Sequence, residues 1–278
     1  MSLQELRGKT VLVTGASSGI GRAAAQAFAA HGCRLALAAR RADKLASLAE
    51  SLEAKGVETL VLTCDVRERD RAREAVDAVI RRWGRLDILL NNAGVHDLDI
   101  FERQDLDLIE DMVRTNLFGT MYTTHAALPG MRRQGSGHIV NVASIAGLTG
   151  LPWMSVYSAS KFAVVGFTES LRRELRGSGV RLTAFCPGTV DTAMAAEPLK
   201  DAELRKTVQP KTPEETAERI VRAVRSGAPE VVFGEASAFV LRLARFFPRF
   251  TDWFMHRSLT RLHPEVRRLL RAESERPG

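Results

Sequence analysis

The sequence contains no run of the roughly 20 apolar residues that a membrane-spanning helix requires. Its first strand-like segment, residues 9–14, begins too early to leave room for a secretory signal peptide. Hydrophobic residues make up 45% of the 278 positions and charged residues 26%, which excludes disorder as the general state. We therefore expect a globular α/β protein with a cytoplasmic location.

Cysteine is scarce. Cys33, Cys64 and Cys186 each lie within or at the end of a strand-like run, and an odd number of cysteines without a pairing pattern argues against a disulfide framework. We expect three reduced core residues. The six histidines are scattered and form no ligand set with the cysteines, so we predict no metal site.

Lysine is rare compared with arginine, and the formal net charge of +7 is unevenly distributed. Residues 235–278 contain nine Arg and no Lys against five acidic residues, so most of the excess is in the C-terminal tail. No helix-turn-helix, zinc-finger or RNA-binding signature accompanies this charge. We therefore expect no nucleic-acid partner.

Short aliphatic runs alternate with amphipathic stretches along the chain. The strand-like runs are residues 9–14, 34–39, 59–63, 87–90, 138–142, 181–185 and 230–233. Helical spacing of apolar residues covers residues 20–30, 43–55, 69–83, 106–128, 162–176 and 213–225. This order predicts an α/β domain over residues 1–234 with a doubly wound parallel sheet of seven strands, in which ligands bind beyond the carboxyl ends of the strands.

The turn after the first expected strand is rich in glycine. Glycines permit a tight strand-to-helix turn and bring backbone N–H groups close to a pyrophosphate at the positive end of the next helix. A purely structural turn is the alternative. The residues that we expect to bind a dinucleotide here are Gly15, Ser17, Ser18, Gly19, Ile20 and Gly21.

Two arginines, Arg40 and Arg41, end the second expected strand. A dinucleotide fold that prefers NAD usually places an acidic residue there for the ribose 2′-hydroxyl, and an acid would repel the extra phosphate of NADP. Arginines instead offer that phosphate charge-assisted hydrogen bonds, with Ser17 and Ser18 within reach. This pattern favours NADP over NAD, with two solvated arginines as the alternative.

Short polar side chains and bare backbone follow the third and fourth expected strands. Asp65 comes after the third strand, and Asn92, Ala93 and Gly94 come after the fourth. They suit the adenine and ribose end of a dinucleotide, although turn chemistry explains either one alone.

Tyr157 and Lys161 are one helical turn apart on the same face. A phenol with an ordinary pKa of about 10 is a poor acid or base near neutrality, and a nearby cation lowers that pKa. We therefore expect Lys161 to tune Tyr157 as a general acid/base. Ser144 ends the fifth strand, where its hydroxyl can bind a carbonyl oxygen on which charge develops, and Asn116 lies inside a helical segment.

These residues, in this order and at this spacing, resemble the short-chain dehydrogenase/reductase family from about Gly8 to Gly234. The resemblance implies a Rossmann-type domain that binds NAD(P). Tyr157 would give a proton to a carbonyl oxygen as the nicotinamide delivers hydride, Ser144 would orient that oxygen, Lys161 would also hold the nicotinamide ribose, and Asn116 would hold a water. Besides Tyr157 and Lys161, the resemblance assigns further residues to the cofactor: Val66, Pro187, Gly188, Val190 and Thr192.

The expected substrate pocket is apolar and is formed by Ile145, Trp153, Met154 and Met194. The C-terminal extension, residues 235–278, groups aromatic residues on one face of an ideal helix over residues 239–254, with arginines to one side. Pro248 interrupts one straight helix. Such a segment closes a pocket, packs on its own domain or a second subunit, or contacts a membrane peripherally through residues 236–262.

The sequence thus predicts an NADP(H)-dependent enzyme that interconverts an apolar ketone or aldehyde and its alcohol. A 3-oxoacyl thioester reductase is the alternative among enzymes, and a non-catalytic NADP-binding scaffold or sensor is the alternative from another class. We expect a homo-oligomer, either a dimer or a tetramer.

Overall fold

Seven parallel strands form one sheet in the order β3-β2-β1-β4-β5-β6-β7. The structure is a computed structural model that describes residues 6–196, 205–206, 208–234, 241 and 246–262. The strands are β1 (Thr10–Thr14), β2 (Arg34–Ala39), β3 (Thr59–Thr63), β4 (Ile88–Asn91), β5 (Gly137–Val142), β6 (Val180–Pro187) and β7 (Glu230–Phe233). The predicted doubly wound sheet is confirmed.

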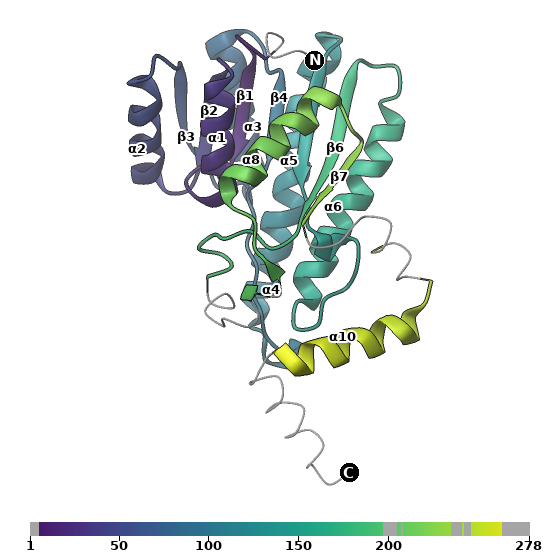
Figure 1. The fold of residues 1–278 in the computed structure, drawn as a ribbon. Helices are drawn as coiled ribbons and strands as arrows, with labels where there is room; N and C mark the ends of the chain where they lie inside the picture. Colours follow the sequence, from purple (N-terminus) through teal and green to yellow (C-terminus); the bar gives the residue numbers. More distant parts are fainter. Residues whose placement is uncertain (1–5, 197–204, 207, 235–240, 242–245, 263–278) are drawn as a thin grey trace.

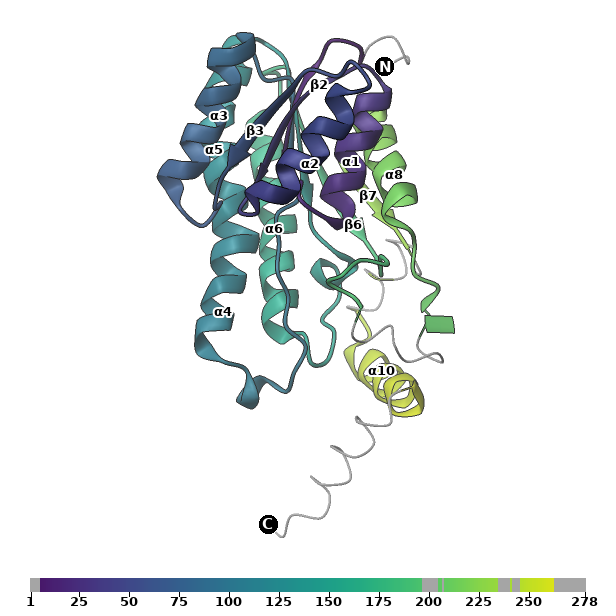
Figure 2. The same cartoon turned by 90° about the vertical axis from the view of Figure 1, so that its left-hand side faces the viewer.

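Helices cover both faces of the sheet (Figures 1 and 2). One layer contains α1 (Gly19–Ala30), α2 (Ala42–Glu53) and α8 (Pro213–Ser226), and the other contains α3 (Arg69–Trp83), α5 (Gly119–Arg133) and α6 (Ser155–Glu174). Side chains alternate across each strand: Val11 and Val13 pack into the core with α1 and α8, whereas Leu12 packs into the core with α3 and α5. Strands buried on both faces explain the nearly uninterrupted aliphatic runs.

Two helices differ from the sequence prediction. The segment predicted as one helix over residues 106–128 consists of α4 (Leu106–Val113), a π-helical turn (Arg114–Phe118) and α5. The helix predicted over residues 162–176 begins at Ser155, seven residues earlier, because its first two turns carry small and polar residues that give no apolar periodicity. The π-helical turn and the first two turns of α6 both carry residues of the candidate site.

The C-terminal helix α10 covers Pro248–Leu262. The sequence suggested an amphipathic helix over residues 239–254, of which residues 239–240 and 242–245 lie outside the described residues. As predicted, no single straight helix runs through Pro248: residues 246–247 are not helical, and Pro248 occupies the first position of α10, where proline forfeits no intrahelical hydrogen bond. Within the described ranges, no helix has the length and apolar character needed to cross a bilayer.

The three cysteines are buried, and none of them forms a disulfide within the part of the chain that the structure describes. Burial raises the pKa of the Cys33 thiol to about 12 and that of the Cys64 thiol to about 11. The predicted core role of these residues is confirmed.

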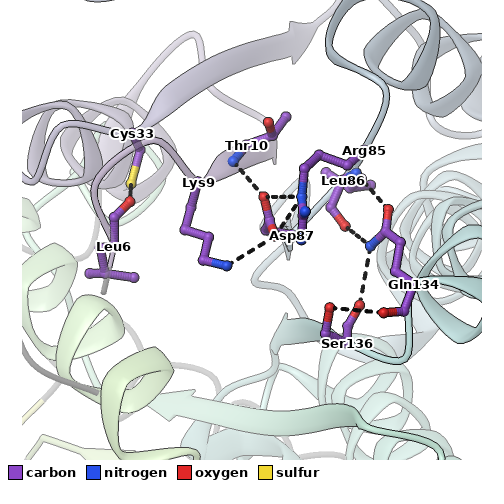
Figure 3. Close-up of polar contacts among 9 residues, drawn as sticks. All are labelled: Leu6, Lys9, Thr10, Cys33, Arg85, Leu86, Asp87, Gln134 and Ser136. Atoms are coloured by element: carbon purple, nitrogen blue, oxygen red, sulfur yellow. Dashed lines mark hydrogen bonds and ion pairs between the residues drawn. The ribbon is translucent and has the colours of Figure 1, made fainter. Parts of the chain in front are cut away.

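At the amino ends of the strands, Asp87 joins the start of β4 to the start of β1 (Figure 3). Its carboxylate accepts hydrogen bonds from the backbone N–H of Thr10 at 3.0 Å, from Arg85 at 2.6 Å and from Lys9 at 3.3 Å. The Asp87 side chain is 7% exposed, whereas that of Arg85 is 44% exposed. This network lies at the end of the sheet opposite the ligand-binding edge.

We expect Asp87→Ala to lower the free energy of unfolding by about 2 kcal/mol, because it leaves the buried Thr10 N–H without its acceptor. Arg85→Ala is the control and should cost less than about 1 kcal/mol, since the guanidinium hydrates readily at the surface. Urea denaturation of both variants measures the difference. Equal losses would show that the Thr10 bond is not the main contribution.

Candidate active site

A cavity of about 580 Å³ opens at the carboxyl ends of the strands. In the sheet, β2 and β3 lie on one side of β1, and β4 to β7 lie on the other side. Ligands of such folds are expected to bind at the carboxyl ends of the strands, where the strand order reverses in this way. The predicted site residues that line it are Gly15, Ser17, Ser18, Gly19, Ile20, Arg40, Arg41, Asp65, Val66, Asn92, Ala93, Gly94, Ser144, Ile145, Trp153, Met154, Tyr157, Lys161, Pro187, Gly188, Val190, Thr192 and Met194. Gly21 and Asn116 are not among the residues that line it.

The glycine turn packs closely against the end of β4. Gly15 has a φ of +66°, and a Cβ there would lie 2.9 Å from the Cα of Ala93. A Cβ on Gly21 would lie 2.3 Å from the carbonyl oxygen of Gly15. Only glycine fits both positions, and the bare backbone at the start of α1 suits a pyrophosphate.

Arg41 lies across the turn from this loop. Its guanidinium donates to the hydroxyl of Ser17 at 2.9 Å and to that of Ser18 at 2.7 Å. Arg40 and Arg41 are both exposed, directly before α2. The structure thus brings together the two serines and the arginine that the sequence assigned to a phosphate, and this donor set fits a phosphomonoester.

An ion pair with Arg67 holds the carboxylate of Asp65 in place. Arg67 donates to its carboxylate at 2.7 Å and also to Asp111 at 2.7 Å. Burial raises the pKa of Asp65, but the hydrogen bonds from Arg67 outweigh this and hold the pKa below its usual value. Asp65 therefore lines the cavity as an ionised carboxylate of fixed orientation.

Ser144, Tyr157 and Lys161 converge on the cavity from the end of β5 and the first two turns of α6. The Lys161 Nζ lies 5.6 Å from the centre of the Tyr157 ring and donates to the carbonyl oxygen of Val142 at 2.9 Å. Ser144 Oγ accepts from the Ala146 N–H at 3.1 Å. A phenol, a hydroxyl and an ammonium therefore share one wall.

The expected lowering of the phenol pKa by Lys161 is wrong in this structure. Burial raises the pKa of Tyr157, and a hydrogen bond with Ser144 offsets only part of that. Burial also lowers the pKa of the Lys161 ammonium to about 8. Removal from water disfavours the charged form of each group, and the sequence does not reveal how far the fold shields each of them from water.

Asn116 occupies the π-helical turn between α4 and α5. Its amide donates to the carbonyl oxygen of Val95 at 2.9 Å and to the hydroxyl of Ser160 at 3.0 Å, and it accepts from the Val95 N–H at 2.9 Å. Such turns frequently accompany functional sites because they redirect a side chain from the helix surface. Asn116 here ties the segment after β4 to α6.

Comparison with known proteins agrees with this arrangement. A family model for short chain dehydrogenases matches residues 9–203. A ketoacyl reductase of Nostoc sp. is 35% identical over 83% of this chain and 80% of its own length. The chain belongs to the short-chain dehydrogenase/reductase family.

A further curated protein and a solved structure are also similar to this dehydrogenase/reductase. The 11-beta-hydroxysteroid dehydrogenase 1A of Arabidopsis thaliana is 42% identical over 69% of this chain and 55% of its own length. A solved short-chain dehydrogenase/reductase from Burkholderia phymatum in complex with NAD has a TM-score of 0.81 and 29% identity, covering 89% of this chain and 96% of its own. The protein is thus an NAD(P)-dependent oxidoreductase of this family.

Sequence reasoning did not name His96 and Met255 as residues of this cavity, and it missed several contacts there. His96 Nε2 lies 2.6 Å from the carbonyl oxygen of Met194, and its ring meets that of Tyr157 edge-on with centres 5.8 Å apart. Trp153 has a φ of +61°, strained for a bulky residue, and its carbonyl oxygen accepts from the Asp99 N–H at 3.1 Å. Met255 of α10 also lines the cavity. No local motif marks these contacts, because each joins distant segments.

A hydrogen bond from His96 to Met194 joins two segments that line the cavity of this dehydrogenase/reductase. A carbonyl oxygen only accepts, so Nε2 carries the proton. We expect His96→Gln, whose amide nitrogen reaches the Nε2 position, to keep KM for a good substrate near that of the wild type. His96→Asn, which mimics only Nδ1, should raise KM about tenfold. Steady-state kinetics of both variants test this, and equal KM values for the two would refute the contact.

Lys161 should lower the free energy of unfolding of this dehydrogenase/reductase near neutral pH. Its pKa is about 8 when folded and 10.5 when unfolded, so the unfolded chain binds more protons between these values and the free energy of unfolding rises with pH in that window. We expect Lys161→Met to be about 2 kcal/mol more stable than the wild type at pH 7, after subtracting the lost bond to Val142. The difference should vanish near pH 10. Urea denaturation of both proteins at the two pH values measures it, and a difference independent of pH would contradict the shift.

Proposed function

We propose that the protein is an NADP(H)-dependent oxidoreductase that interconverts an apolar ketone or aldehyde and the corresponding alcohol. The observation that carries the proposal is that the glycine turn, Arg41, Ser144 and Tyr157 line one cavity. A dinucleotide spanning that cavity would meet donors for a phosphate near α2 and an acid near α6.

The catalytic roles that we propose follow from the contacts of each group. A nicotinamide coenzyme bound in this cavity would supply the hydride that the substrate carbon receives. The partly buried phenol of Tyr157 keeps its proton near neutrality, because its ordinary pKa is already well above neutral and desolvation raises it further, and it gives that proton to the carbonyl oxygen. The Ser144 hydroxyl orients the same oxygen, and Asn116 fixes the segment after β4 against α6. Oxidation of an alcohol runs through the same groups in reverse.

Lys161 has two roles in this scheme. Its ammonium lies against the Tyr157 ring and is anchored by the Val142 carbonyl oxygen, so it supplies positive potential where a phenolate would form. It also lies close to Gly94, where an added Cβ would be 3.6 Å from Nζ. We propose that it binds the ribose of the coenzyme there as well.

The lining of the cavity supports an apolar substrate. Ile145, Trp153, Met154 and Met194 follow β5 and β6, which lie on the other side of β1 from β2, where Arg40 and Arg41 follow; Met255 adds a further apolar group. The hydroxysteroid dehydrogenase relative has a name that fits this class. The ketoacyl reductase relative keeps a 3-oxoacyl thioester as the second candidate substrate.

NADP in preference to NAD, a cytoplasmic location and a homo-oligomer, a dimer or tetramer, complete the proposal. So does the division into a catalytic domain over residues 1–234 and an extension over residues 235–278. Light scattering of the purified full chain measures the mass of the assembly, and a monomer would overturn the expected oligomer.

A panel of carbonyl compounds tests the activity. Oxidation of NADPH followed by absorbance should be fastest with apolar ketones or aldehydes, slower with NADH, and slow with sugars. Faster turnover of 3-oxoacyl thioesters would favour the second candidate. Binding of NADPH without oxidation across the panel would overturn both and favour a scaffold or sensor.

A further inference from the structure

The outward side of α10 presents a cluster of aromatic side chains to solvent. Phe250, Trp253 and Phe254 are 63%, 57% and 54% exposed, and Phe246 and Phe247 just before the helix are also exposed. The ring centre of Phe250 lies 6.0 Å from that of Trp253 and 6.4 Å from that of Phe254. Exposed aromatic patches of this kind mark interaction surfaces.

Another side of the same helix faces the body of the protein. At about 100° per residue, Met255 lies about 140° around the helix from Phe250 and about 100° from Phe254, and Thr251 lies between Phe254 and Met255. Both are only partly exposed, and Met255 forms part of the cavity wall. Figures 1 and 2 show α10 lying across one end of the molecule, beyond the helical layers. The helix thus has its aromatic face outward and its cavity-lining face inward.

Charge distinguishes the possible occupants of the aromatic face. Arg249 and Arg257 are exposed beside it, and the Arg257 guanidinium lies 5.8 Å from the Trp253 ring. Asp252 is the only acidic residue in the described range 246–262. A second copy docked face to face would bring like charges together, whereas an anionic lipid surface pairs with the arginines and takes up the aromatic rings at the headgroup level.

We propose that α10 docks in the plane of an anionic bilayer surface, with Phe250, Trp253 and Phe254 at the boundary between headgroups and acyl chains. The cavity that Met255 lines then lies behind α10, with the helix between it and the membrane, and an apolar substrate dissolved in the bilayer enters the cavity beside α10. The docking rests on the surface of α10 alone, whereas the route of the substrate also rests on the proposed function.

Co-sedimentation of the full chain with phosphatidylcholine vesicles, with and without phosphatidylserine, tests the docking. We expect binding that requires phosphatidylserine and weakens with salt. A variant with Phe250→Ser, Trp253→Ser and Phe254→Ser should lose at least about tenfold in partition coefficient. Arg249→Gln with Arg257→Gln should lose about tenfold.

The matched control is Arg219→Gln with Arg222→Gln, which removes the same charge from the exposed side of α8 and should change binding much less. If both arginine pairs weaken binding equally, attraction depends on net charge and the proposed surface is wrong. A wild type that does not bind vesicles, or an aromatic variant that changes only the mass of the assembly, would also overturn it.

Turnover of a water-soluble carbonyl substrate separates this proposal from the proposed function. The α10 variants should turn it over as the wild type does, which also shows that they are folded. Loss of vesicle binding with unchanged turnover supports the docking. Vesicle binding by a wild type that oxidises no NADPH would leave the docking standing and refute the enzyme.

Discussion

Tyr157→Phe should lower kcat for carbonyl reduction by about 10²–10⁴-fold, because it removes the group that gives the proton and leaves the shape of the wall intact. Binding of NADPH should change little, since the phenyl ring keeps its contact with Lys161. Stopped-flow absorbance of NADPH with saturating substrate measures the chemical step directly, and fluorescence titration measures binding.

The chain provides a matched control for this variant, because it contains only one other tyrosine. Tyr122 lies on α5, stacked on Phe118 with ring centres 6.0 Å apart and outside the cavity wall. Tyr122→Phe should keep the turnover of the wild type. If Tyr157→Phe retained more than a few per cent of wild-type turnover, another group would be the acid.

The strands were predictable because burial on both faces imposes a simple pattern. Runs such as Val11 to Val13 are aliphatic at every position, and each predicted strand lies within two residues of the observed one. The glycine turn was predictable for a related reason. A Cβ at Gly15 or Gly21 would collide with backbone, so the local geometry excludes other residues.

The details around Asn116 were not predictable from periodicity. The π-helical turn spans only five residues between two α-helices, so apolar periodicity alone joins residues 106–128 into one continuous helix. What selects the turn is a set of long-range bonds from Asn116 to Val95 and Ser160. Such bonds depend on the finished fold.

The electrostatics of Tyr157 and Lys161 show the same limit. Their spacing along α6 predicts proximity, which the structure bears out at 5.6 Å. The direction of each pKa shift, however, depends on how much water the fold excludes, and here burial is the largest cause of the shift for both groups. Sequence spacing therefore identified the pair but not its protonation.

The preference for NADP should depend on the two arginines before α2. A variant with Arg40→Ala and Arg41→Ala should weaken NADPH binding by about 10²-fold, because it removes two charge-assisted donors from the phosphate position. NADH lacks that phosphate, so its dissociation constant should change less than about threefold, which is the size of effect expected from losing a surface charge. Fluorescence titration of both coenzymes with each protein gives the four dissociation constants.

Two comparisons separate specific binding from general attraction. Arg82→Ala removes an exposed charge near the end of α3 and should leave both affinities unchanged. Ser17→Ala should weaken NADPH binding only modestly, because the hydroxyl that accepts from Arg41 orients the guanidinium without supplying charge. A wild type that binds NADH more tightly than NADPH, or equal losses for both coenzymes in the arginine variant, would show that these side chains do not recognise a 2′-phosphate.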